Sequence, residues 1–157
     1  MQIFKRLGAG ALAVALLAPL SLTQLTSKPN LSGKWNLNLE KSWEAGGAKL
    51  HYQSILLEID HKEPAIRIVQ TVDGSKVIPI EVRTDGVPVQ SSILGGAATS
   101  WAKWEGNTLV SFLHRDTGNG NSLEIVRRLT ISADGKTMTA IREPLGGKLI
   151  AEFWDRK

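Results

Sequence analysis

The stretch Asn30-Leu31-Ser32-Gly33-Lys34-Trp35-Asn36-Leu37-Asn38-Leu39 decides the fold of this 157-residue chain. From Trp35 onward every second residue is apolar, and the residues between them are asparagines. A period of two is typical of a β-strand with one buried face. Gly33 has no Cβ, so another side chain or backbone can approach the strand closely just before the indole. The sequence therefore predicts a first strand that buries Trp35 in the core.

Residues 1–27 are predicted to be a secretory signal peptide. Lys5 and Arg6 precede an apolar run from Leu7 to Leu20, and a more polar segment follows. The uninterrupted apolar run is shorter than the ~20 residues that a membrane-spanning helix needs, and Pro19 closes it. No clear Ala-x-Ala cleavage site fixes the boundary. We expect a periplasmic or extracellular protein with one domain, residues 28–157, and no stable membrane anchor after processing.

Composition excludes several classes of protein. The formal net charge is +4. Lys5 and Arg6 supply two of these charges, so the chain after the signal peptide carries about +2, which is too little to indicate nucleic-acid binding. The absence of cysteine excludes disulfide bonds, a cysteine nucleophile and a lipid-modified cysteine.

Turn signals recur about every ten residues after Leu50. Pairs such as Asp73-Gly74, Asp85-Gly86 and Asp134-Gly135 supply the positive φ angles that tight hairpins require. The segments between the turns are rich in Ile, Val, Thr and Leu, as strands are. Together with the first strand they predict about ten antiparallel strands, the later ones over 51–60, 65–72, 76–83, 87–93, 97–104, 108–115, 122–131, 136–143 and 147–155.

An open sheet of this size would leave one apolar face in water and two edges unpaired. Closure into an up-and-down β-barrel removes both problems, so we predict an all-β, antiparallel barrel. A β-sandwich is the alternative that the same turn spacing permits. Alternation predicts an inward-facing set consisting of Trp35, Leu37, Ile55, Leu57, Ile59, Ile66, Ile68, Ile78, Ile80, Val82, Ala102, Trp104, Leu109, Leu113, Leu123, Ile125, Leu129, Met138, Leu149 and Phe153. A second apolar set faces the other way: Leu56, Val69, Phe112, Val126, Ile141 and Trp154.

The motif Gly33-Lys34-Trp35 at the start of a run of antiparallel strands resembles the first strand of lipocalin and calycin barrels. The wider phrase from Leu31 to Ser42 is similar to small secreted bacterial lipocalin-like proteins. The resemblance implies that Gly33 and Trp35 close the barrel structurally. It also implies an arginine stacked on the tryptophan, and an interior that binds an apolar or amphiphilic ligand.

Polar residues share the predicted inner face, namely Gln53, Gln70, Ser91, Ser100, Ser111, Arg115, Arg127 and Arg142. A buried guanidinium needs a partner. Three arrangements are open for Arg127 and Arg142. In the first arrangement one of the two stacks on Trp35, as the resemblance implies, and Arg142 is preferred over Arg127 for this contact. Alternatively one anchors the carboxylate of a ligand. In the third arrangement a bulge shifts the alternation and both face water.

No catalytic signature is present: the sequence has no Gly-x-Ser-x-Gly elbow, no phosphate-binding loop and no pair of histidines at metal-ligand spacing. We therefore expect a binding protein that needs no cofactor or metal and performs no catalysis. The candidate ligand-binding residues are Arg127, Arg142, Trp104, Gln70 and Arg115. The alternative is a protein–protein interaction module, an inhibitor or an envelope-assembly factor, whose barrel is packed solid.

Overall fold

The computed structural model describes residues 28–76, 79–93 and 96–157. These residues form strands, turns and loops, and none of them is helical. The predicted signal peptide, residues 1–27, lies outside the described residues, as does Ile78 of the predicted inward set.

The strands follow the predicted segments closely, apart from the segment 76–83, which contributes to two short strands. In chain order they are β1 (Gly33–Leu37), β2 (Trp43–Glu44), β3 (Ile55–Lys62), β4 (Ala65–Val72), β5 (Ser75–Lys76), β6 (Ile80–Arg83), β7 (Val89–Ile93), β8 (Gly96–Glu105), β9 (Thr108–Gly118), β10 (Asn121–Ile131), β11 (Thr137–Pro144) and β12 (Ile150–Arg156).

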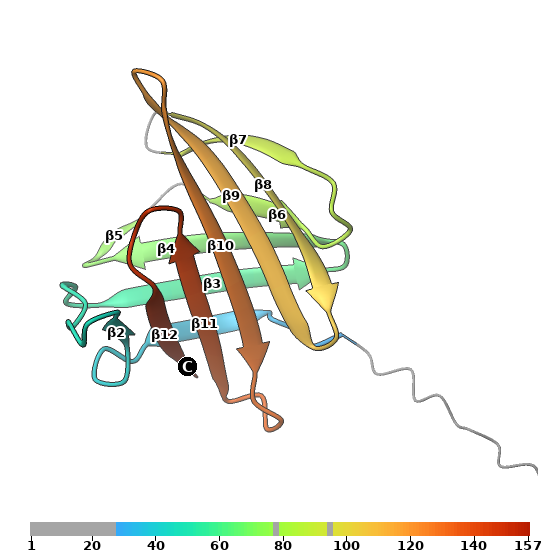
Figure 1. The fold of residues 1–157 in the computed structure, drawn as a ribbon. Coiled ribbons are helices and arrows are strands. Elements are labelled where there is room, and N and C mark those ends of the chain that lie inside the picture. The colour runs from blue at the N-terminus through green and yellow to red at the C-terminus, as the bar shows by residue number, and fades with distance from the viewer. Residues whose placement is uncertain (1–27, 77–78, 94–95) are drawn as a thin grey trace, which may run out of the picture.

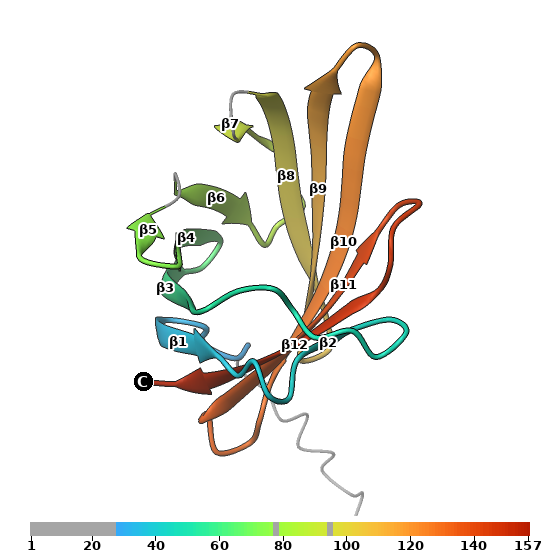
Figure 2. The same cartoon turned by 90° about the vertical axis from the view of Figure 1, so that its left-hand side faces the viewer.

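All the strands belong to one antiparallel sheet. Ten of them form a continuous path in the order β5-β4-β3-β1-β12-β11-β10-β9-β8-β7, while β2 pairs with β12 and β6 pairs with β4. The sheet curls so that β8–β11 cross in front of β3 and β4 (Figure 1), and the view from the side shows the strands surrounding a common interior (Figure 2). The fold is a nearly closed antiparallel barrel. The alternative prediction of a sandwich of two sheets is wrong.

Among the described strands, β6 and β8 are not paired by a continuous ladder of hydrogen bonds. Three contacts nevertheless join β6 and the loop after it to β8. Ser100 Oγ donates a hydrogen bond of 2.9 Å to the carbonyl of Glu81, and Gly86 N donates to the carbonyl of Ala102 at 2.9 Å. Asp85 and Lys103 form an isolated β-bridge. These contacts bring the two edges of the sheet together. They join β6 and the loop after it to the second half of β8, close to the β8–β9 turn.

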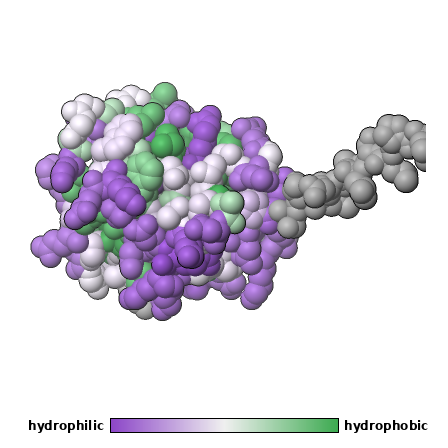
Figure 3. Space-filling view, turned by 90° about the horizontal axis from the view of Figure 1, so that it is seen from below, coloured by the Kyte–Doolittle hydropathy of each residue, from purple (hydrophilic) through white to green (hydrophobic). Residues whose placement is uncertain are grey.

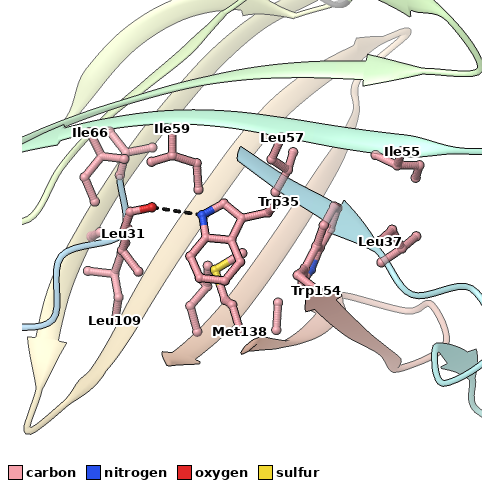
Figure 4. Packing of buried hydrophobic residues seen from close by; sticks show 14 residues of the cluster. Leu31, Trp35, Leu37, Ile55, Leu57, Ile59, Ile66, Leu109, Met138 and Trp154 are labelled. Carbon is pink, nitrogen blue, oxygen red and sulfur yellow. Dashed lines mark hydrogen bonds between the residues drawn. The ribbon is translucent and has the colours of Figure 1, made fainter. Parts of the chain in front are cut away.

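The core lies around Trp35, whose side chain is fully buried (0% exposed). Its indole Nε1 donates a hydrogen bond of 3.0 Å to the carbonyl of Leu31, and Leu57, Met138 and Trp154 surround it (Figure 4). Leu31 precedes β1, so the indole both fills the barrel and ties down the segment that leads into it. We call this the closed end of the barrel.

The last strand has the opposite alternation from the one that the sequence indicates. Trp154, expected on the outer face, is only 2% exposed and belongs to the core cluster. Its partners Leu37 and Met138 face the core as well. Because neighbouring residues in a strand point to opposite faces, Phe153 points outward, and the prediction for this pair is wrong.

The outer surface is predominantly polar on the face seen from below in Figure 1, with small apolar patches between the polar side chains (Figure 3). Among the described residues, none forms a helix that is long and apolar enough to span a membrane.

Candidate functional site

The inner face of the barrel leaves a cavity of about 110 Å³ beyond the packed core. Its wall is mostly aliphatic, with Leu57, Ile68 and Ile125 from three different strands. Four polar side chains, Gln70, Ser100, Ser111 and Arg127, complete the lining. An apolar wall with a few polar groups is the usual composition of a small-molecule pocket.

Arg127, Arg142 and Glu152 form a polar cluster on the inner faces of β10, β11 and β12. Arg127 and Arg142 are directly opposite each other across the β10–β11 ladder. Arg142 Nη2 lies 3.3 Å from Glu152 Oε1, and Arg127 Nη2 lies 3.7 Å from Glu152 Oε2. Each carboxylate oxygen thus faces a different guanidinium. We call these three residues the arginine–glutamate cluster.

The hydrogen-bonding capacity of this cluster is only partly used. Glu152 Oε2 and the Nε atoms of Arg127 and Arg142 are buried and have no hydrogen-bond partner. The Glu152 side chain is 6% exposed, whereas those of Arg127 and Arg142 are 29% and 22% exposed. The carboxylate is therefore the most buried group of the cluster, and Arg127 lines the cavity.

The arginine that stacks on Trp35 is Arg156, whose Cζ lies 4.2 Å from the centre of the indole. The prediction that Arg142 or Arg127 makes this contact is wrong. Arg156 Nη1 donates to the carbonyl of Ser32 at 2.8 Å, and its Nε donates to the carbonyl of Gly135 at 2.7 Å. A Cβ on Gly33 would come within 2.8 Å of the same guanidinium, so Gly33 leaves the space that Arg156 occupies.

Trp104 lies at the closed end, away from the cavity lining. Its indole Nε1 donates to Glu63 Oε1 at 2.6 Å, and Glu63 also accepts hydrogen bonds from Thr84 Oγ1 and from the ring of His61 at 3.1 Å. His61 in turn accepts from the backbone N–H of Leu31 through Nδ1 at 3.1 Å. These contacts cover the end of the barrel beside the core.

The hydrogen bonds at Glu63 alter the acidity of that carboxyl group. Burial acts to raise the pKa of Glu63, but the bonds from Thr84, Trp104 and His61 together outweigh burial, and the pKa lies below its ordinary value. Glu63 is therefore held in its charged form at neutral pH.

The structure brings together three of the five candidate ligand-binding residues. Gln70 and Arg127 line the same cavity, and Arg142 adjoins Arg127 through Glu152. Arg115 shares the inner face of β9 with Ser111 but lies nearer the β9–β10 turn, beside Gly96 of β8. Trp104 is remote from this group.

Sequence reasoning misses Glu152 and Arg156 because it misassigns the alternation of the last strand. Placing Phe153 inside puts both charged residues outside. The signal that could identify them is the charge itself, since Glu152 interrupts the otherwise apolar run from Leu149 to Trp154. A charge in an apolar strand needs a buried partner or water.

Within residues 28–76, 79–93 and 96–157, no three His, Asp or Glu side chains gather as a metal site would require. His51, His61 and His114 are accordingly not grouped. The outer face carries an aromatic pair instead: Trp101 and Phe112 stack with ring centres 5.2 Å apart. They border a groove of about 520 Å³ together with Val126.

Comparison with solved structures identifies barrels of the same kind. A secretory abundant heat soluble protein of Ramazzottius varieornatus matches with a TM-score of 0.63 and 12% identity over 84% of this chain and 98% of that chain. Lipid binding protein 8 of Caenorhabditis elegans, in its apo form, matches with a TM-score of 0.58 and 14% identity over 80% and 94% of the two chains. Fatty-acid-binding protein 1 of Echinococcus granulosus matches with a TM-score of 0.56 and 10% identity over 80% and 96%.

These identities show a shared fold alone. No protein-family model matches the sequence, and no curated protein matches it. The fold is that of the lipocalin-like and fatty-acid-binding β-barrels.

Proposed function

We propose that this lipocalin-like barrel binds a small amphiphilic molecule in its interior, without chemical turnover. The apolar part of the ligand lies against the aliphatic wall, and its anionic headgroup lies at Arg127 and Arg142. The observation that carries the proposal is the cluster of two arginines and one buried glutamate, of which Arg127 also lines the internal cavity.

The charge of the cluster supports an anionic headgroup. With Glu152 ionised, two guanidinium groups face one carboxylate, so a positive charge remains inside a largely apolar barrel. A charge in such surroundings is costly unless it is paired. A ligand carboxylate would supply the pairing, and guanidinium groups bind carboxylates through charge-assisted hydrogen bonds.

The size of the cavity indicates the size of the ligand. About 110 Å³ corresponds to roughly four water molecules at ~30 Å³ each. A headgroup and the first part of a chain fit in this volume, and we expect a longer tail to extend along the barrel away from the closed end. The names of two barrels of similar fold, a lipid binding protein and a fatty-acid-binding protein, agree with a ligand of this class.

We further propose that the barrel works outside the cytoplasm of a bacterium, in the periplasm or the medium, after removal of residues 1–27. The support is the pattern of residues 1–27, with Lys5 and Arg6 before an apolar run. Mass spectrometry of the protein secreted by a bacterial host would give the mature N-terminus. A chain that keeps Met1 and stays in the cytoplasm would contradict this proposal.

Binding of a homologous series of alkyl carboxylates, from butyrate to dodecanoate, tests the ligand proposal by titration calorimetry. We expect Arg127→Leu and Arg142→Leu to weaken binding about tenfold or more, as loss of a charged hydrogen bond does, while the melting temperature changes little. Arg128→Leu is the matched control because Arg128 is on the outer face of the same strand, paired with Glu143 at 2.9 Å. Equal effects at positions 127 and 128, or no binding of any carboxylate by the wild-type protein, would contradict the proposal.

The second candidate function is a protein–protein interaction module. The observation that favours it is the outer groove of about 520 Å³ beside the stacked Trp101 and Phe112. If this groove is the functional surface, Trp101→Ala should abolish association with a partner or with a second copy and leave carboxylate binding unchanged. Native mass spectrometry distinguishes the two cases, because it detects both a bound small molecule and an oligomer.

A further inference from the structure

The arginine–glutamate cluster contains a buried negative charge in addition to its two positive charges. The two arginines are cross-strand neighbours, and like charges in that position repel each other. Glu152 meets both guanidinium groups, one through each carboxylate oxygen, at 3.3 and 3.7 Å. One carboxylate therefore offsets one of the two positive charges and leaves a net charge of +1.

We propose that Glu152 is a positioning and specificity-determining residue that restricts the site to headgroups with a single negative charge. This inference rests on the proposed function, because it concerns the headgroup of the ligand bound there. A monoanion such as a carboxylate brings the cluster to neutrality. A dianion such as a phosphate monoester leaves a net charge of −1 inside the barrel.

The burial of the three side chains supports this role. Glu152 is 6% exposed while the arginines are 29% and 22% exposed, so the carboxylate is the most buried group of the cluster. Glu152 is not among the residues that line the cavity, whereas Arg127 is. A dianion would leave one negative charge without a partner in this largely apolar interior, and burial of an unpaired charge is costly.

The remaining charged residues of the inner face lie outside the cluster. Arg115 is nearer the β9–β10 turn, beside Gly96 of β8. Arg156 contacts Trp35, and His61 bonds to Glu63, both at the closed end. These residues are unchanged in Glu152→Gln. They therefore do not account for a difference between that variant and the wild-type protein in the relative affinity for carboxylate and phosphate.

The test compares an alkyl carboxylate with an alkyl phosphate of equal chain length, between pH 5 and pH 8. The second pKa of a phosphate monoester is about 6, so the phosphate changes from a monoanion to a dianion over this range. We expect the wild-type protein to bind the carboxylate about tenfold more tightly than the phosphate at pH 8, with the difference shrinking toward pH 5, since a neighbouring like charge typically shifts a titration by one unit or more.

Glu152→Gln should raise the relative affinity for the phosphate at pH 8 by about tenfold, because it removes the repelling charge and preserves the shape of the side chain. Glu143→Gln, at an exposed glutamate on the outer face, should leave the ratio unchanged. Phosphorus NMR of the bound alkyl phosphate gives a second measurement on the wild-type protein alone: binding should raise the second pKa of the phosphate.

The outcomes separate the two proposals. If the wild-type protein binds the carboxylate and Arg127→Leu weakens it, but the phosphate dianion binds equally well, the restriction to monoanions is wrong and the proposed function stands. An unchanged ratio in Glu152→Gln leads to the same conclusion. If Glu152→Gln does not fold, a phosphate whose second pKa is unchanged on binding to the wild-type protein overturns the inference. Failure of both ligands to bind overturns the proposed function and this inference with it.

Discussion

Arg156 is the residue that links the closed end of the barrel together. Its guanidinium lies over Trp35 at 4.2 Å and donates hydrogen bonds to the carbonyls of Ser32 and Gly135. These carbonyls belong to the segment before β1 and to the turn between β10 and β11. One side chain near the end of the chain thus joins three parts of the fold that are distant in sequence.

Replacing Arg156 with methionine should lower the free energy of unfolding by about 1–2 kcal/mol. The variant loses a cation–π contact and two hydrogen bonds from a charged donor, and keeps most of the apolar stem. Urea unfolding followed by tryptophan fluorescence measures the change. Lys157→Met is the matched control, since Lys157 is bonded through its backbone N–H to Lys34. If both variants unfold at the same urea concentration, Arg156 does not stabilise the closed end.

Among the elements, β12 is the strand whose inner residues most affect both the core and the site. Glu152, Trp154 and Arg156 alternate along its inner face. Glu152 belongs to the arginine–glutamate cluster, Trp154 to the core, and Arg156 to the closed end. A one-residue shift of this strand would move all three outward.

The alternation of β12 can be tested with two neighbouring aromatic residues. Trp154→Ala should cost about 3–5 kcal/mol, as expected for truncation of a buried aromatic side chain. Phe153→Ala should cost less than half as much, because Phe153 is partly exposed on the outer face. Chemical denaturation of both variants gives the comparison. A larger loss for Phe153 would show that the strand has the opposite orientation.

Glu63, in the turn between β3 and β4, makes the free energy of unfolding depend on pH in the acidic range. The pKa of Glu63 is lowered from its ordinary value of 4.5, so its contribution is fully present above pH 4.5 and is lost as the pH falls through the lower pKa of the folded state. Glu63→Gln should therefore be less stable than the wild-type protein at pH 7, and the difference should shrink below pH 4.5. Thermal unfolding from pH 7 to pH 3 measures this. A difference that stays constant over that range would mean that the charge of Glu63 is not involved.

Strand positions can be predicted from the sequence because turns and alternation are local properties. Alternation places Trp35, Leu57 and Met138 inside, and all three are buried. The pairing of distant charges cannot be predicted in the same way. Phe153 and Trp154 are adjacent large aromatics, so alternation alone does not decide which of them is buried, and the positions of Glu152 and Arg156 depend on that choice.

At the scale of the whole molecule, a ligand that binds the folded barrel alone should stabilise it by mass action. At a free ligand concentration of one hundred times Kd, the free energy of unfolding should rise by about 2.7 kcal/mol. Thermal unfolding at increasing concentrations of an alkyl carboxylate measures the rise. Arg127→Leu should need a proportionally higher concentration for the same shift, and a melting temperature that does not depend on ligand concentration would contradict binding.

The pairing of β1 with β12 also bears on how the protein is made. Trp35 lies opposite Arg156, so the first strand of the barrel pairs with β12, and β2 to β11 lie between the two along the chain. A nascent chain that has not yet reached Ile150 lacks the strand that seals the core. We therefore expect the core around Trp35 to close only once β12 has been synthesised.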